Sequence, residues 1–315
     1  MKWGLAGAIL WALDTVIIGL ALAMLNAAYP TGSIVLAPLV STFLHDAIIS
    51  LLESLPSAFN GRYKAIAKMM RGKAGWYVVA GSLIGCPVAN AGNMLAISQI
   101  GPSYAAAITA FYPAVGALLA RIFLGERMRW IQWVGLGACM AGVAVLGFNP
   151  QDGVSGNWAY GIIAALVAVV GWAVQVVFIS LAFRMGGVDG KMCVQVRYTL
   201  SVIVYLCAVF PALGAWGYVG FAVTSAAMPL IGLSALAGMA AMLCYYIGLA
   251  QMGATRAMAI DITYAAWAIP LEFIILGRVP SALGVVCSIT VVAGSIVAAS
   301  DMSQLIGRPR GEGST

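Results

Sequence analysis

The chain has 315 residues, of which 63% are hydrophobic and only 8% are charged, and its mean hydropathy is +0.99. Soluble domains carry about 25% charged residues, so this composition excludes a water-soluble globular protein. The formal net charge is +6, but most basic residues lie in short segments between apolar stretches, as in membrane proteins. The lipid bilayer is therefore an expected partner, and nucleic acid is not.

A transmembrane helix needs about 20 predominantly apolar residues. The sequence predicts ten such spans, at residues 3–25, 33–54, 74–97, 102–124, 129–148, 157–183, 191–213, 228–250, 254–277 and 280–300. With the N-terminus in the cytoplasm, thirteen of the sixteen Lys and Arg residues fall on the cytoplasmic side. The positive-inside rule thus predicts a multi-pass protein of the inner or plasma membrane with both termini cytoplasmic.

An internal repeat organises these spans. Residues 96–125 recur as residues 248–277, with eleven of thirty positions identical at a constant offset of 152 residues. Five spans in each half place the second half upside down in the membrane, and such inverted repeats are typical of secondary transporters with a midplane substrate site. We expect a first repeat at 1–150, a second at 151–302 and a disordered tail at 303–315.

The first span carries Asp14, about 16 Å deep at 1.5 Å per residue and so near the midplane. Trp11 lies three residues earlier on the same face, and the span at 157–183 repeats this arrangement with Trp172 and Gln175. A carboxylate beside aromatic faces suits an organic cation. In the alternative interpretation, the two indoles are packing residues and Asp14 pairs with Arg197.

The second span contains the adjacent pair His45 and Asp46, and Arg197 lies 152 residues after His45 in the span at 191–213. Ionisable groups inside a bilayer are costly and usually face the protein interior. Because histidine titrates near neutral pH, these three residues are candidates for proton coupling or gating. Hydrogen bonds that lock the helices together explain them equally well.

Further polar and aromatic residues mark the remaining walls. Asp261, Tyr264 and Trp267 follow one another at steps of three in the span at 254–277, which predicts a stripe along one side of a helix. Tyr112 is the repeat counterpart of Tyr264, and the two either complete an aromatic cage or donate hydrogen bonds that fix the repeat interface. Asn93 and Tyr245, in the spans at 74–97 and 228–250, are additional candidate wall residues.

Other chemistry is poorly represented. The sequence has one His and six Cys without CxxC spacing, which predicts neither a metal site nor disulfides. There is no set of nucleophile, base and orienting residue for catalysis. We therefore expect no enzymatic activity and no cofactor.

The chain resembles the drug/metabolite transporter superfamily, in its EamA-like, ten-helix branch, and within it LicB-type bacterial choline importers. The resemblance covers about residues 3–300 and is carried by Trp11, the His45-Asp46 pair, Pro87, Asn93, Tyr112-Pro113-Ala114, Gly171-Trp172, Arg197, Tyr245-Tyr246, Tyr264 and Trp267. It implies import of choline or a similar quaternary amine into an aromatic cage, without ATP.

The chain departs from those importers in where it carries negative charge. Gln175 stands where they have a Glu, and Gly238 stands where they have an Asp. Conversely, Asp14 and Asp261 occupy positions that are uncharged in that pattern. The negative charge is kept but moved between helices.

The predicted protein is thus an all-α polytopic membrane protein that imports a choline-like organic cation by alternating access. Its predicted site comprises Trp11, Asp14, Asn93, Tyr112, Trp172, Gln175, Tyr245, Asp261, Tyr264 and Trp267. Protons are a candidate coupling ion. The alternatives are an exporter of amino acids, aromatic metabolites or drugs with the same fold, and a non-transporting membrane receptor or assembly component.

Overall fold

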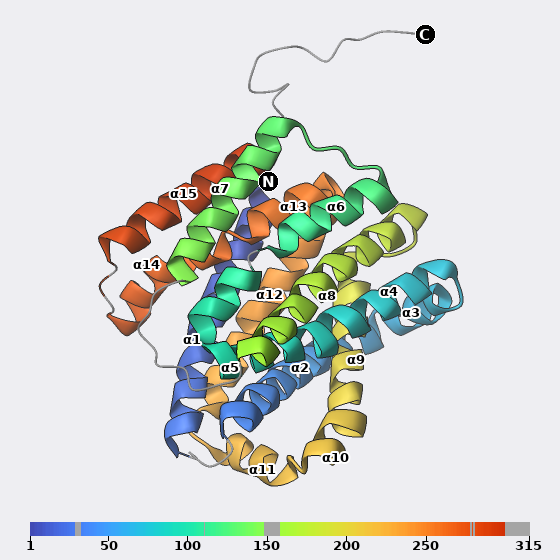
Figure 1. Cartoon of the computed structure of the whole chain (residues 1–315). Helices are drawn as coiled ribbons and strands as arrows, with labels where there is room; N and C mark the ends of the chain where they lie inside the picture. Colours follow the sequence, from blue (N-terminus) through green and yellow to red (C-terminus); the bar gives the residue numbers. More distant parts are fainter. Residues whose placement is uncertain (29–32, 110, 148–157, 278, 280, 300–315) are drawn as a thin grey trace.

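The computed structural model describes residues 1–28, 33–109, 111–147, 158–277, 279 and 281–299 (Figure 1). These residues are almost entirely helical and contain no strand. The elements are α1 (Lys2–Ala28), α2 (Ser33–Phe59), α3 (Arg62–Met70), α4 (Lys73–Leu83), the π-helical η1 (Ile84–Val88), α5 (Ala89–Thr109), α6 (Tyr112–Leu124), α7 (Trp130–Gly147), α8 (Trp158–Met185), α9 (Gly190–Val204), the π-helical η2 (Tyr205–Val209), α10 (Phe210–Leu213), α11 (Trp216–Thr224), α12 (Met228–Met252), α13 (Ala254–Asp261), α14 (Tyr264–Leu276) and α15 (Ala282–Ala299).

The prediction of an all-helical polytopic membrane protein is confirmed. Within the described ranges, seven helical segments are long and apolar enough to cross a membrane: Lys2–Ala28, Val35–Phe59, Trp158–Met185, Gly190–Leu213, Met228–Met252, Ala254–Leu276 and Ala282–Ala299. Two shorter apolar helices are Tyr112–Leu124 and Trp130–Val145. The count of ten spans stays a prediction, and the predicted repeat boundary at 150/151 and the tail at 303–315 lie outside the described residues.

Several boundaries differ from those predicted. Helical residues continue through 98–101, where the sequence predicts a junction between two spans. The predicted helix at 254–277 is instead divided at Ile262–Thr263 into α13 and α14. Two short helices that were not predicted, α3 and α11, lie between spans. Apolar length alone does not reveal such breaks, because the residues on both sides remain hydrophobic.

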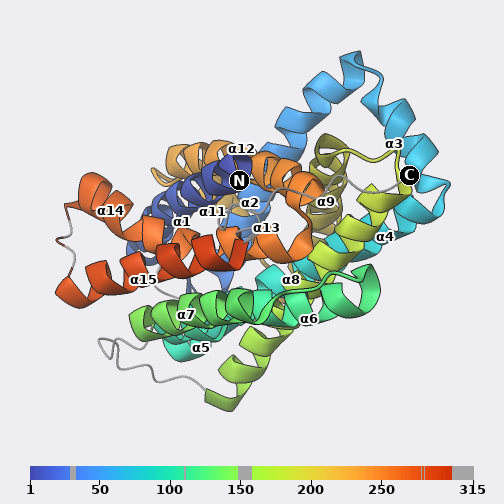
Figure 2. The ribbon, with the colours of Figure 1, turned by 90° about the horizontal axis from the view of Figure 1, so that it is seen from above.

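Glycines bring the main helix pairs into close contact. Figure 2 shows α1 beside α12 and α7 beside α15. A Cβ atom added at Gly7 of α1 would lie 3.2 Å from the backbone of Ala241 and Tyr245 of α12. Small residues let membrane helices approach until their backbones touch, where dispersion forces stabilise the pair. Gly135 of α7 and Gly294 of α15 allow the same close backbone contact between these two helices.

Replacing Gly135 with Val is expected to destabilise the α7–α15 contact by about 1–3 kcal/mol, since overpacking a tight interface forces backbone shifts. A Cβ at this position would stand 2.6 Å from the carbonyl oxygen of Gly294, which cannot rotate away. Thermal unfolding in detergent measures the effect. Gly137→Val is the matched control, because a Cβ there meets nothing within 4 Å. Equal melting temperatures for the two variants would contradict this account of the interface.

The helical break between α12 and α13 is held by a residue from the first half of the chain. The carboxylate of Glu126, which follows α6, accepts hydrogen bonds from the backbone N–H groups of Ala254 and Thr255, both at 3.0 Å. It also lies 3.4 Å from Nη2 of Arg184 at the end of α8. An anion at a helix N-terminus is favourable because it satisfies unpaired N–H groups. This contact therefore joins the two halves at the end expected to be cytoplasmic.

Candidate functional site

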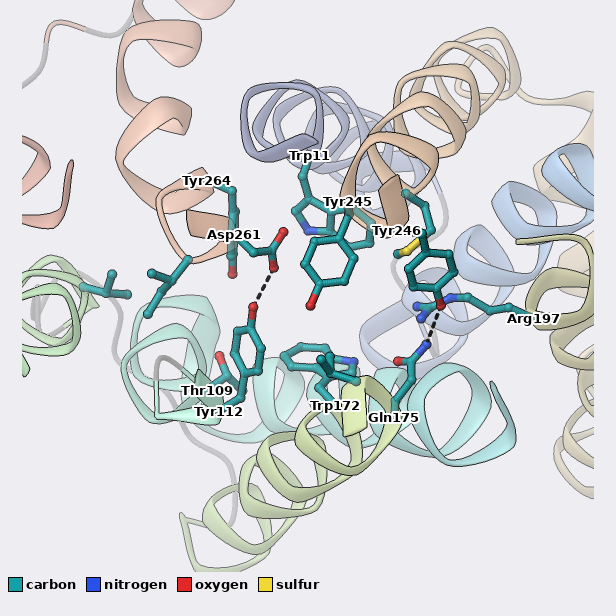
Figure 3. Close-up of a pocket in the computed structure, with 14 residues that line it drawn as sticks. Trp11, Thr109, Tyr112, Trp172, Gln175, Arg197, Tyr245, Tyr246, Asp261 and Tyr264 are labelled. Carbon is teal, nitrogen blue, oxygen red and sulfur yellow. Dashed lines mark hydrogen bonds between the residues drawn. The ribbon is translucent and has the colours of Figure 1, made fainter. Parts of the chain in front are cut away.

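A cavity lies where helices from both halves of the chain converge (Figure 3). It contains about 750 Å³ of space free of protein atoms, part of which is open solvent. Its lining residues are Trp11, Thr109, Tyr112, Val143, Trp172, Gln175, Val176, Arg197, Met242, Tyr245, Tyr246, Asp261, Ile262 and Tyr264.

One end of the cavity carries a carboxylate. Asp261 is the last residue of α13, and the break at Ile262–Thr263 leaves its side chain facing the cavity. The hydroxyl of Tyr112 donates a 2.6 Å hydrogen bond to Oδ2 of Asp261. Tyr112 begins α6 directly after the turn at Phe111, and Figure 3 shows its side chain pointing toward Asp261.

Aromatic side chains form the walls next to this carboxylate. Figure 3 shows Trp11 and Tyr245 on one side, from α1 and α12, and Trp172 of α8 on the other. Trp172 packs edge-on against Tyr112, with ring centroids 6.0 Å apart and an interplanar angle of 80°. The buried hydroxyl of Tyr245 has no hydrogen-bond partner within the described part of the chain. Aromatic faces carry negative potential, so these walls favour a cation.

The opposite end of the cavity carries Arg197 of α9, which is only 4% exposed. Its guanidinium lies beside the hydroxyl of Tyr246 in Figure 3. That hydroxyl accepts a 3.2 Å hydrogen bond from Nε2 of Gln175. Gln175 is held tightly, because a Cβ at Gly85 would fall 1.9 Å from its Oε1 atom. This end therefore combines a buried positive charge with an amide and a phenol.

A second polar cluster is buried beside the cavity but does not line it. Nδ1 of His45 lies 3.1 Å from Oδ1 of Asp46, and its Nε2 lies 3.5 Å from Oδ1 of Asp14. Asp14 also accepts a hydrogen bond from the hydroxyl of Ser234 on α12. Ser201 donates a 2.6 Å hydrogen bond to Asp46. Asp14 thus pairs with His45 and Ser234, and the alternative pairing of Asp14 with Arg197 is wrong.

Gly238 explains why this cluster fits between α1, α2 and α12. A Cβ at Gly238 would lie 2.7 Å from Nε2 of His45 and 2.8 Å from Oδ2 of Asp14. The space of a side chain on α12 is therefore occupied by polar groups from α1 and α2. His45 and Asp46 are adjacent on α2, and their side chains contact each other.

Hydrogen bonds connect the buried cluster to the cavity wall. The thiol of Cys86 donates to Oδ2 of Asp46 at 3.4 Å, and the Asn90 amide donates to the Cys86 sulfur at 3.7 Å. The indole N–H of Trp172 in turn donates to Oδ1 of Asn90 at 2.9 Å. Cys86 lies in η1, a π-helical segment that also contains Pro87. Such segments are rare and occur frequently at functional sites.

The structure brings most of the predicted site residues together. Seven of them line the cavity: Trp11, Tyr112, Trp172, Gln175, Tyr245, Asp261 and Tyr264. Arg197, predicted as a coupling or gating residue, lines it as well. Asp14 belongs to the cluster with His45 and Asp46, and Asn93 and Trp267 are not among the lining residues. Sequence reasoning gave Asn90, Tyr246 and Thr109 no role at the site.

The fold and the cavity define a class of protein: a helical membrane protein with an aromatic and charged cavity in its interior. Residues 1–148, just under half of the chain, match the EamA-like transporter family, and the predicted resemblance to that family is confirmed. This match supports a membrane transporter of the drug/metabolite superfamily.

Two comparisons extend beyond the first half. Protein LicB of Haemophilus influenzae is 22% identical over 224 residues, which cover 70% of this chain and 74% of LicB. One solved crystal structure of a protein matches with a TM-score of 0.67 at 19% identity, covering 94% of this chain and 95% of that one. This second match is a likeness of fold alone.

Proposed function

We propose that the protein imports choline or a related quaternary-ammonium cation through the cavity. The observation that carries this proposal is the Asp261 carboxylate set among aromatic side chains, which come from α1, α6, α8, α12 and α14. The carboxylate supplies net negative charge, and ring faces attract a methylated ammonium that cannot donate hydrogen bonds. The similarity to LicB supports the same conclusion.

Transport proceeds by alternating access between two inverted repeats, at 1–150 and 151–302. Tyr112 from the first and Asp261 from the second meet at the cavity, as expected of a midplane site shared by two repeats. The Glu126 contact with α13 joins the halves on one side only, and it must loosen when that side opens. The protein lies in the inner or plasma membrane with both termini in the cytoplasm, which the distribution of Lys and Arg supports.

The membrane potential drives import of a cation, at about 2.3 kcal/mol per charge per 100 mV. The buried cluster of Asp14, His45 and Asp46 supplies a place for a coupled proton. Burying two carboxylates without a compensating positive charge is costly, and the imidazole of His45 contacts both of them. Further titratable or charged groups near this cluster are Tyr198, Tyr205, Cys86 and Arg197.

Isothermal titration of the purified protein with choline tests the proposal. We expect micromolar binding, and Trp11→Ala is expected to weaken it about tenfold through the loss of one cation–π face and its packing. The uncharged isostere 3,3-dimethylbutan-1-ol is the ligand control, since it has the shape of choline without the charge. The protein should bind it at least tenfold more weakly than choline. Equal affinities for the two ligands, or no binding of choline by folded protein, would refute a quaternary-amine site.

A further inference from the structure

The two ends of the cavity carry opposite charges. Asp261 stands at one end with Tyr112, and Arg197 stands at the other with Gln175 (Figure 3). The aromatic residues Trp11, Tyr245 and Trp172 lie between them. A site for a simple cation gains nothing from a guanidinium on its own wall, because like charges repel. The arrangement matches a ligand with a positive group and a negative group.

In the described part of the chain, Arg197 forms no salt bridge with a carboxylate. Among the described residues, no Asp or Glu oxygen lies within 4.0 Å of its guanidinium, and its buried Nε has no hydrogen-bond partner. The nearby Asp46 is occupied by Ser201, His45 and Cys86. A buried charge without a salt bridge is costly in a membrane protein, and it usually marks a functional group.

Gln175 is the reason that the positive charge of Arg197 is not neutralised at this end of the cavity. It lines the same end of the cavity as Arg197, and its amide donates to Tyr246 without contributing charge. A carboxylate at this position would neutralise the guanidinium from within the protein. With an amide there, the positive charge of Arg197 stays available, and a guanidinium binds a carboxylate through two parallel hydrogen bonds.

We propose that the substrate of this cavity is a zwitterion, with a quaternary ammonium group in the aromatic box beside Asp261 and a carboxylate at Arg197. The inference rests on the proposed function and narrows it from choline-like cations to carboxylated quaternary amines. The cavity lining holds one negative and one positive side chain, and a zwitterion leaves that balance unchanged. Choline adds a positive charge and leaves Arg197 without a partner.

Calorimetric titration with trimethylglycine (betaine) and with choline tests the proposal. We expect the protein to bind betaine at least tenfold more tightly than choline. Arg197→Gln should reduce betaine affinity at least tenfold while leaving choline binding equal or stronger. Gln175→Glu should produce the same reversal with almost no change in shape, so it tests the inference even if the Arg197 variant fails to fold. Arg121→Gln is the matched control, because Arg121 is exposed at the end of α6 and absent from the cavity lining.

The outcomes separate the two proposals. Tighter binding of choline than of betaine, with neither substitution altering their ratio, would overturn the zwitterion inference and leave the quaternary-amine site standing. Absence of binding of both ligands to folded protein would overturn the proposed function together with the inference. Betaine binding that is lost in both Arg197→Gln and Gln175→Glu, but kept in Arg121→Gln, would support the inference.

Discussion

Asp261→Asn is expected to weaken the binding of any quaternary amine by about 10- to 100-fold, equivalent to about 1.4–2.8 kcal/mol. The carboxylate faces the cavity and is the only acidic side chain among the lining residues of the described chain. An asparagine keeps its shape and can still accept the hydrogen bond from Tyr112, so the substitution removes charge and little else. Titration calorimetry at constant pH and ionic strength gives the change in affinity.

The matched control for this charge is Glu272→Gln. Glu272 belongs to α14 and does not line the cavity, so its neutralisation should leave affinity within twofold of the unmodified protein. The uncharged isostere of choline provides a second check, since its weak binding should not respond to Asp261→Asn. If the Asp261 and Glu272 variants bind choline and betaine as the unmodified protein does, the carboxylate has no part in recognition.

Two substitutions, Asp14→Ala and Gly238→Asp, together move the buried carboxylate from α1 to α12. Each is expected to be harmful alone, and the second is expected to compensate for the first. Gly238→Asp alone would place a third carboxyl group against Asp14 and His45, with its Cβ within 2.8 Å of both side chains. Overpacking and like-charge repulsion should together destabilise the protein by about 3 kcal/mol or more. Asp14→Ala alone should remove a partner of His45 and Ser234 and impair transport.

The double variant Asp14→Ala/Gly238→Asp is expected to recover most of the lost stability, because it restores one carboxylate beside His45 and opens the space that Asp14 occupied. Thermal unfolding in detergent and the pH dependence of uptake into proteoliposomes measure the recovery. Asp14→Ala/Gly238→Asn is the control, with the same shape and no charge. The free energy of unfolding of the double variant should differ by at least about 1 kcal/mol from the sum of the two single effects. If the two effects simply add, the two positions do not share one site.

The sequence was sufficient to locate most of the cavity because charged and aromatic residues are conspicuous in apolar spans. It failed where helices deviate from regular geometry. The stripe of Asp261, Tyr264 and Trp267 presumed a continuous helix, and the break at Ile262–Thr263 leaves Trp267 out of the cavity lining. A π-helical turn contains extra backbone, so the segment η1 shifts the residues after it around the helix axis. Asn90, not Asn93, consequently bonds to Trp172.

The sequence also did not predict the roles of several small residues in the buried cluster. Gly238 gives no chemical signal in the sequence, yet its missing side chain admits Asp14 and His45. Ser201 and Ser234 are likewise inconspicuous among apolar residues, although both donate hydrogen bonds to buried carboxylates. Such roles depend on which helices meet, and a single sequence contains that information only through its repeat. The offset of 152 residues related His45 to Arg197 but could not show that one lies behind the cavity and the other on its wall.

The hydrogen bonds from Asp46 through Cys86 and Asn90 to Trp172 have a thermodynamic consequence. Two ligands that bind at connected sites influence each other by the same factor in both directions. A proton on the buried cluster that strengthens substrate binding must itself be held more tightly when the substrate is present. The number of protons taken up per substrate bound then equals the slope of log Kd against pH.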